Sequence, residues 1–187
     1  MKVLILFAII LINIILSLQF SFLAPILPLE IKRRQISQIY TGFIMSAICV
    51  GYIVCPYFIT EICYPRLGRR GTTLLGFMIM SASLFLYGVA YFIPDSQKEV
   101  FIICSILTRL MEGSGLGAAA TSMVSLIVRL FPDEVGKASS ARFFGTYSGI
   151  TVGVVSGAFL RDKIGYLWVF ISFSILIGLS SFLLFVF

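Results

Sequence analysis

Two opposite charges, Arg109 and Glu112, lie near the middle of a long apolar run of the chain. A spacing of three residues puts both side chains on one face of a helix, where they can form an ion pair. A charge inside a membrane segment is costly and usually faces a partner or an aqueous cavity. Two interpretations follow: Glu112 takes a proton or holds a cationic substrate in a central cavity, or the pair only fixes its helix against a neighbour.

Two amides, Asn13 and Gln19, interrupt the first apolar run. They are not on one stripe of a helix, so they can serve different purposes. Each either hydrogen-bonds a neighbouring helix or lines a cavity. With Arg109 and Glu112 they form the candidate substrate- or proton-binding set. Arg142, near the start of the fifth apolar run, is expected to reach the lipid headgroups by snorkelling.

The composition excludes several classes of chemistry. The sequence has no His, which removes Ser-His and Cys-His catalysis, zincin motifs and haem ligation by His. Its four Cys form no CxxC pair and are expected to pack as small apolar residues. The sequence also lacks the paired membrane-embedded Asp of aspartyl chemistry and a channel's filter or arginine-rich helix. We therefore predict no enzyme, no catalytic or metal-binding residue and no cofactor.

The chain is too apolar for a water-soluble globule. Of its 187 residues, 59% are hydrophobic and 12% are charged, with a mean hydropathy of +1.07. Soluble domains carry about 25% charged residues. The net charge of +6 lies in short gaps between apolar runs. This placement favours a role in membrane orientation and argues against nucleic-acid binding.

Six apolar runs predict an all-α integral membrane protein with six transmembrane helices, because each bilayer crossing needs about 20 apolar residues. The runs cover approximately 3–27, 40–60, 72–93, 100–130, 139–160 and 166–187. Their connections are short, so 1–187 is expected to form a single transmembrane domain. The first run lacks a small-x-small cleavage site and is expected to be retained. Basic residues are equal in number on the two sides, so they do not decide the orientation.

A weak internal repeat divides the chain into two sets of three helices. Pro28-Leu29-Glu30 follows the first predicted helix, and Pro132-Asp133-Glu134 follows the fourth. Arg66-Leu67-Gly68-Arg69 and Asp162-Lys163-Ile164-Gly165 correspond in the same way after the second and fifth. Because three is odd, the second set enters the membrane with the opposite sense. The sequence therefore predicts two inverted repeats, at about 1–93 and 99–187.

Four stretches together carry a resemblance to a known family. They are the double-proline end of the first helix (22–30), the loop after the second helix (65–70), the Arg-and-glycine stretch of the fourth (109–117) and the glycines of the fifth (149–157). In this order the chain resembles the N-terminal six-helix half of a major facilitator superfamily transporter. It is most similar to the vesicular amine and polyamine transporter and drug:proton antiporter branch. Pro65 replaces the Asp of the family's loop, and Val154 replaces the proline of the antiporter signature.

The resemblance implies half of a secondary active transporter that moves a small organic solute by proton-coupled alternating access. The single acidic Glu112 favours a cationic solute. The fourth- and fifth-helix glycines are expected to pack helices and to gate the pathway: Gly113, Gly117, Gly149, Gly153 and Gly157. Arg66, Gly68, Arg69 and Arg70 are expected in a cytoplasmic loop, either as an interdomain latch or against anionic headgroups. Both termini would then be cytoplasmic.

The expected partners are membrane lipids, a small-molecule substrate and either a second six-helix half or another copy of the chain. Nucleic acid is not expected. The alternative function is a six-helix membrane subunit without transport, or a truncated transporter half that acts as a scaffold in a larger complex. The sequence predicts an integral, multi-pass membrane protein and does not name the membrane.

Overall fold

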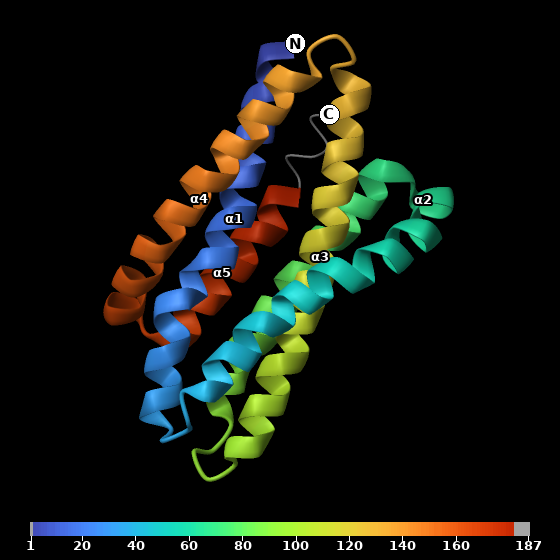
Figure 1. The fold of residues 1–187 in the computed structure, drawn as a ribbon. Helices are drawn as coiled ribbons and strands as arrows, with labels where there is room; N and C mark the ends of the chain where they lie inside the picture. The colour runs from blue at the N-terminus through green and yellow to red at the C-terminus, as the bar shows by residue number, and fades with distance from the viewer. Residues whose placement is uncertain (1, 182–187) are drawn as a thin grey trace.

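The computed structural model describes residues 2–181, with the side chains of residues 4–181, and within them it has five α-helices and one short 3₁₀ helix (Figure 1). Their bounds are α1 (Lys2–Arg33), α2 (Ile39–Val89), η1 (Ala90–Phe92), α3 (Lys98–Leu130), α4 (Val135–Ile164) and α5 (Tyr166–Ser180). The first four α-helices are long and apolar enough to cross a membrane, and α5 is a shorter apolar helix. The prediction of an all-helical fold is therefore confirmed, whereas the count of six crossings stays a prediction. The end of the predicted run 166–187 lies outside the described residues.

The predicted connection between the runs 40–60 and 72–93 is present but shorter than a loop, because α2 consists of two helical segments that meet at a kink at Gly68. Only Gly68 leaves the helical conformation, with φ 68° in the left-handed region that glycine adopts at little cost. A straight helix of 51 residues would be about 77 Å long, more than twice the bilayer core. Gly51 and Gly76 both pack against residues 110–119 of α3, so α2 folds back on itself (Figure 1). We call residues 39–67 the first arm of α2 and residues 69–89 its second arm.

The predicted end of the first helix near residue 27 is wrong. Helix α1 continues through Pro25 and Pro28 to Arg33. Each proline removes one backbone N–H, a loss that membrane helices tolerate when neighbouring groups compensate. Glu30 accepts hydrogen bonds from Arg33 and Arg34, one turn further along. These bonds support the last turn that the proline pattern alone would end.

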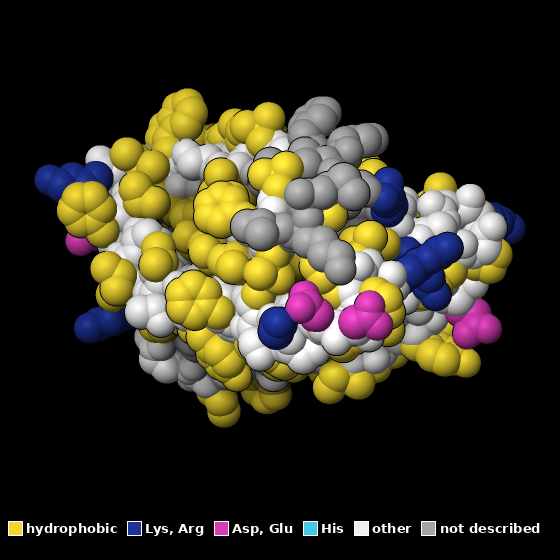
Figure 2. All heavy atoms as spheres, turned by 90° about the horizontal axis from the view of Figure 1, so that it is seen from above, with side chains coloured by type: hydrophobic (Ala, Val, Ile, Leu, Met, Phe, Trp, Pro, Cys, Tyr) yellow, Lys and Arg dark blue, Asp and Glu magenta, His cyan; other side chains and the backbone are white. Residues whose placement is uncertain are grey.

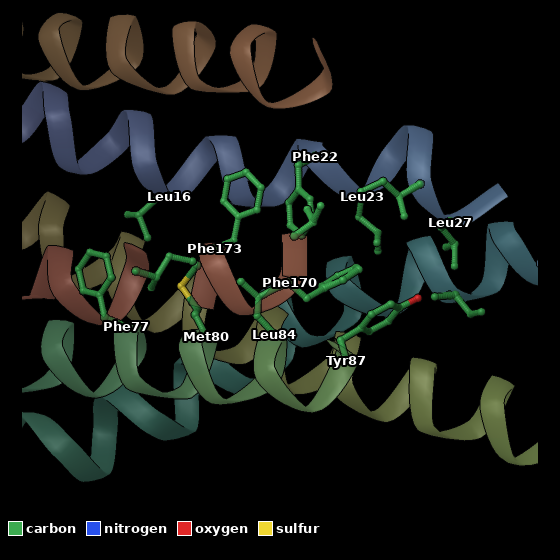
Figure 3. Packing of buried hydrophobic residues seen from close by; sticks show 14 of the residues in the cluster. Leu16, Phe22, Leu23, Leu27, Phe77, Met80, Leu84, Tyr87, Phe170 and Phe173 are labelled. Carbon is green, nitrogen blue, oxygen red and sulfur yellow. The ribbon is translucent and has the colours of Figure 1, made fainter. Parts of the chain in front are cut away.

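The helices pack in pairs around a shared apolar core. Helix α1 lies along α4, α2 lies along α3, and α5 packs mainly against the second arm of α2. Figure 3 shows the core between α1, α2 and α5. There the rings of Phe22 and Phe173 stack with centroids 4.4 Å apart, and those of Tyr87 and Phe170 stack at 5.1 Å. Residues from the first and last described helices thus close one core.

Candidate functional site

A buried polar cluster joins three segments in the interior of the bundle. Arg109 and Glu112 of α3 form the predicted ion pair. Gln19 of α1 donates from Nε2 to Glu112 Oε1 at 2.9 Å. The guanidinium of Arg109 also lies 5.6 Å from the ring centroid of Tyr87, on the second arm of α2. All three members of the hydrogen-bonded group are at most 2% exposed.

The cluster leaves several hydrogen-bonding atoms unused. Within the described residues, Arg109 Nε and Nη2, Gln19 Oε1 and the Tyr87 hydroxyl have no hydrogen-bond partner. A buried polar group without a partner costs about 1–3 kcal/mol. Most buried polar groups are satisfied, so an unsatisfied set of this kind calls for an explanation. The cluster therefore has the capacity to accept a further partner or to rearrange.

A cavity of about 470 Å³ lies between α1, the first arm of α2, α3 and α4. Its wall is largely apolar, with Phe20 of α1 and Tyr52 of α2 as the aromatic contributions. The full lining is Asn13, Leu16, Ser17, Phe20, Ile48, Cys49, Tyr52, Ile53, Leu116, Ala120, Arg142, Thr146 and Ile150. Mostly apolar walls with a few polar groups are typical of small-molecule sites.

The four predicted binding residues do not form one site. Arg109, Glu112 and Gln19 lie together in the cluster, and none of them lines the cavity of α1–α4. Asn13 does line it, and its Nδ2 donates to the Ile9 carbonyl of its own helix at 2.8 Å. Asn13 and Gln19 thus lie in different surroundings, as their spacing suggested. Glu112 is 2% exposed and does not line this cavity, and its role in proton or substrate binding stays a prediction.

Arg142, which the sequence predicts to reach the lipid headgroups, lines the cavity. It is half-buried on the wall formed by α4, about 10 Å along the axis from the start of that helix. Its Nε is buried without a hydrogen-bond partner in the described part of the chain. The signal was present in the sequence: Arg142 precedes Gly145 by three residues, and residues three apart share a helix face.

Glycines let the paired helices approach to backbone contact. On α4, a Cβ added at Gly149, Gly153 or Gly157 would overlap a carbonyl oxygen of α1, and the same holds at Gly145. On α3, Gly113 and Gly117 meet carbonyl oxygens of the first arm of α2. The predicted packing positions therefore lie at helix contacts. Their role in gating stays a prediction.

The predicted cytoplasmic loop is the fold-back of α2. Gly68, Arg69 and Arg70 border a second cavity of about 580 Å³ together with Arg129 at the end of α3. Arg66 does not line it. The basic cluster is thus joined by a cation from another helix. The latch and headgroup hypotheses both stay open.

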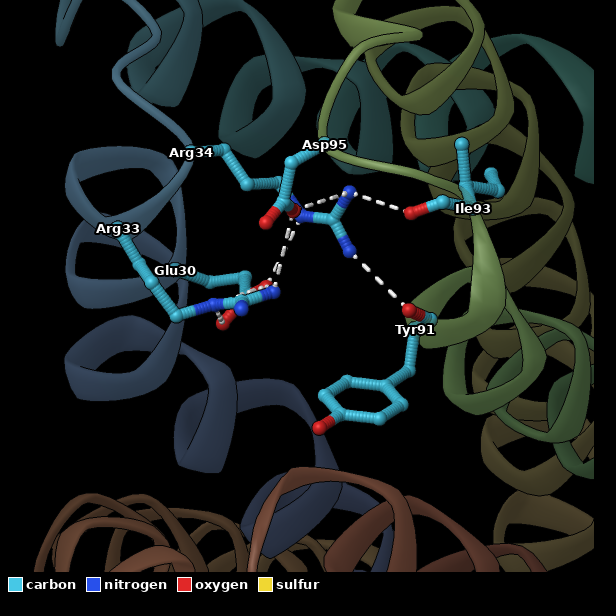
Figure 4. A network of polar contacts seen from close by, with 6 residues as sticks. All are labelled: Glu30, Arg33, Arg34, Tyr91, Ile93 and Asp95. Carbon is cyan, nitrogen blue, oxygen red and sulfur yellow. Dashed lines mark hydrogen bonds and ion pairs between the residues drawn. The ribbon is translucent and has the colours of Figure 1, made fainter.

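A second polar cluster, at the end of α1, was not anticipated (Figure 4). Arg34 donates to Glu30 Oε1 at 2.9 Å, to the Ile93 carbonyl at 2.8 Å and to the Tyr91 carbonyl at 3.2 Å. It is 2% exposed and lies over the Phe101 ring, with its Cζ 4.2 Å from the centroid. Asp95 adds an ion pair at 3.3 Å. The sequence signal was the spacing of Glu30, Arg33 and Arg34, which fits one helix face.

Large apolar side chains cover much of the outer surface. They include Ile53 and Tyr57 on α2 and Phe144 and Val155 on α4, each more than half exposed. Figure 2 shows one end of the molecule, where hydrophobic side chains spread over much of the face and Lys and Arg lie mostly toward its left and right. An apolar exterior of this kind suits a lipid environment or contact with further helices.

Comparison with known proteins gives a consistent result. Residues 9–187 match the sequence family described as Major Facilitator Superfamily. Over 147 residues the chain is 24% identical to the MFS-type transporter SLC18B1 of Homo sapiens, covering 79% of this chain and 32% of the human protein. The proteins of the same name from Mus musculus and Rattus norvegicus are each 22% identical over 147 residues. The chain thus spans about a third of the length of the curated relatives it matches.

Proposed function

The chain belongs to the Major Facilitator Superfamily, and we propose that it forms one half of a secondary transporter that moves a small organic solute by alternating access. It is an integral, multi-pass membrane protein. Its relatives point to a transporter rather than an enzyme. The observation that carries the proposal is the cavity of about 470 Å³ between helices of both predicted repeats.

The pairing of the helices supports the inverted repeat. The α1–α4 contact joins predicted helices one and five, and the contact of α3 with the first arm of α2 joins four and two. If predicted helices one, two and three are exchanged with four, five and six, the pair of one and five becomes the pair of four and two. The remaining contact, between α5 and the second arm of α2, joins six and three and is unchanged by the exchange. Inverted repeats place the substrate site where the repeats meet.

Two rigid pairs give a simple mechanism for alternating access. The glycine contacts hold α1 to α4 and α3 to the first arm of α2 at backbone distance. Contact between the two pairs is sparse, and the Gln19–Glu112 hydrogen bond crosses it. We propose that the two helix pairs rock against each other. Protonation of Glu112 would weaken its ion pair with Arg109 and alter the hydrogen bond from Gln19 that joins the two helix pairs. Proton movement would thereby be coupled to the opening of the cavity.

The native Cys49 provides a test, because it is exposed and lines the cavity. In the full-length protein, Cys55, Cys63 and Cys104 are replaced by Ser, and a membrane-impermeant thiol reagent is added from either side of sealed proteoliposomes. Alternating access predicts that Cys49 reacts from both sides. Labelling from one side only would contradict the mechanism and favour the non-transporting subunit.

A matched control uses a buried position on α3. Ser122 is fully buried, so Ser122→Cys in a background without other cysteines should resist the reagent from both sides. Proton coupling is tested in the same assay: lowering the pH should shift Cys49 labelling toward one side, and Glu112→Gln should remove this shift. An unchanged pH response in Glu112→Gln would reject the role of Glu112 while leaving alternating access intact.

A further inference from the structure

The cavity between α1, α2, α3 and α4 has one charged residue in its lining, and that residue is a cation. Of the thirteen lining side chains, only Arg142 carries a charge. The other polar groups are the amide of Asn13 and the hydroxyls of Ser17, Tyr52 and Thr146. The electrostatic character of the site is therefore set by Arg142.

Arg142 has no counter-ion within residues 2–181. No carboxylate lies within ion-pair distance of it, and its Nε is buried without a hydrogen-bond partner. Its Cζ lies 5.6 Å from the ring centroid of Phe143, the next residue in the chain. A guanidinium that is half-buried and unpaired has donors available for a ligand. Because Arg presents its donors as a planar fork, a carboxylate can bind it through two parallel hydrogen bonds.

The acidic residue that would favour a cationic solute is not available to this cavity. Glu112 is 2% exposed and already holds Arg109 and Gln19. It is absent from the cavity lining, as are all other carboxylates. An organic cation entering the cavity would meet Arg142 as a like charge, which is unfavourable at low dielectric.

We propose that this cavity binds an organic anion, with an apolar body against the α1 and α2 walls and a carboxylate paired with Arg142. Phe20 and Tyr52 provide aromatic surface for the body. Asn13 Oδ1 and the neighbouring hydroxyls orient polar substituents near the charge. This inference rests on the proposed function and names the substrate class of the same site.

The test compares three probes of one shape and different charge: naphthoate, naphthamide and naphthylmethylamine. Full-length protein in phosphatidylcholine nanodiscs is dialysed to equilibrium against each probe, with empty nanodiscs to subtract partitioning into lipid. We expect naphthoate to bind more tightly than naphthamide and naphthylmethylamine to bind least. Preferential binding of the amine, or no binding of naphthoate, would overturn the inference.

The role of Arg142 is isolated with variants. Arg142→Gln should weaken naphthoate binding roughly 10- to 100-fold, as expected for loss of one charge-assisted pair, with little effect on naphthamide. Arg142→Lys, which keeps the charge, should recover part of the affinity. Arg161→Gln removes another arginine of α4 that lies outside this cavity, and it should bind naphthoate like the wild type. Equal naphthoate affinity in Arg142→Gln and the wild type would also overturn the inference.

An anionic phospholipid could offer the same chemistry as a free carboxylate. Repeating the dialysis with phosphatidylserine in the nanodiscs separates the two sources, since a lipid ligand would displace naphthoate and a lipid-independent site would not. Displacement would overturn the assignment to a soluble solute. The Cys49 labelling above does not depend on any probe, so a failure of this inference is distinguishable from a failure of the transport proposal.

Discussion

Two clusters of arginine and glutamate hold this fold, and they are built differently. In the interior, Glu112 is paired with one arginine, and Arg109 keeps Nε and Nη2 without partners in the described chain. At the end of α1, Glu30 is held by both Arg33 and Arg34. Arg34 also donates to two backbone carbonyls beyond α2. The central cluster has few partners, whereas the cluster at the end of α1 has several side-chain ion pairs and two hydrogen bonds to the backbone.

This difference suggests that the cluster at the end of α1 is a structural clamp, whereas the central cluster can respond to protonation. Backbone carbonyls do not titrate, so the two Arg34 bonds that hold α1 against the connection between α2 and α3 do not depend on pH in the range where proteins fold. Glu112 depends on a single ion pair and one amide, so a change of its protonation alters most of what holds it. Substitutions in the two clusters should therefore reduce the stability of the protein by different amounts.

The largest effect is expected from Arg109→Ala, which leaves Glu112 buried without a cation. Breaking a buried pair costs about 3–5 kcal/mol. The melting temperature of the purified protein in detergent measures this loss. Arg109→Ala combined with Glu112→Ala should be milder than Arg109→Ala alone, because no lone charge remains. A double variant as unstable as the single one would show that packing, and not the charge, dominates the central cluster.

Arg34→Ala should be the next largest, at about 1–3 kcal/mol, because it leaves the Ile93 and Tyr91 carbonyls without a donor. Its effect stays below that of Arg109→Ala, because Arg33 still pairs with Glu30. Arg33→Ala is the control, since its side chain is 45% exposed. If Arg33→Ala destabilised the protein more than Arg34→Ala, the clamp would be assigned to the wrong arginine.

Gln19→Leu should cost about 1–2 kcal/mol, because it removes a hydrogen bond to an ionised group and restores part of the loss by apolar packing. The matched control is Asn13→Leu, whose amide bonds only its own helix. Thermal melting should rank Gln19→Leu as the more destabilised of the two. The opposite ranking would mean that the bond between α1 and α3 contributes little.

The smallest effect is expected from Asp95→Asn. Its side chain is 60% exposed, and Arg34 retains its other partners. Exposed ion pairs contribute about 0–1 kcal/mol. The melting temperature should fall slightly in low salt and not at all in high salt, because salt screens exposed charges. A large loss that persists in high salt would make Asp95 an essential part of the clamp.

Local spacing predicted the elements and contacts that depend on one helix. The Arg109–Glu112 pair and the glycine column of α4 both follow from helical periodicity. The apolar runs located the helices, because a membrane span needs a fixed length. The continuation of α1 past Pro28 depends on charges further along, and hydropathy alone does not report them.

Contacts between distant segments could not be predicted in this way. The cavity position of Arg142 requires knowing that α4 lies along α1 and faces α2 and α3 across the gap. The Arg34 clamp requires residues about 60 positions away. Gln19 meets Glu112 only because two helices cross at that level. Each of these contacts depends on how a helix is rotated about its axis. Periodicity shows which residues share a helix face, but it does not show which neighbouring helix that face contacts.

The glycine contacts between the paired helices also constrain how the gene can change. Every single-base substitution that alters a glycine codon introduces a residue with a Cβ or a stop. At Gly149, Gly153 and Gly157 any Cβ would meet the α1 backbone, which cannot move aside as a flexible side chain can. No smaller residue exists to replace them. Inherited substitutions at these three glycines should therefore be rare. Gly42 and Gly136 have no atom within 4 Å of an added Cβ, so other residues can replace them without a clash.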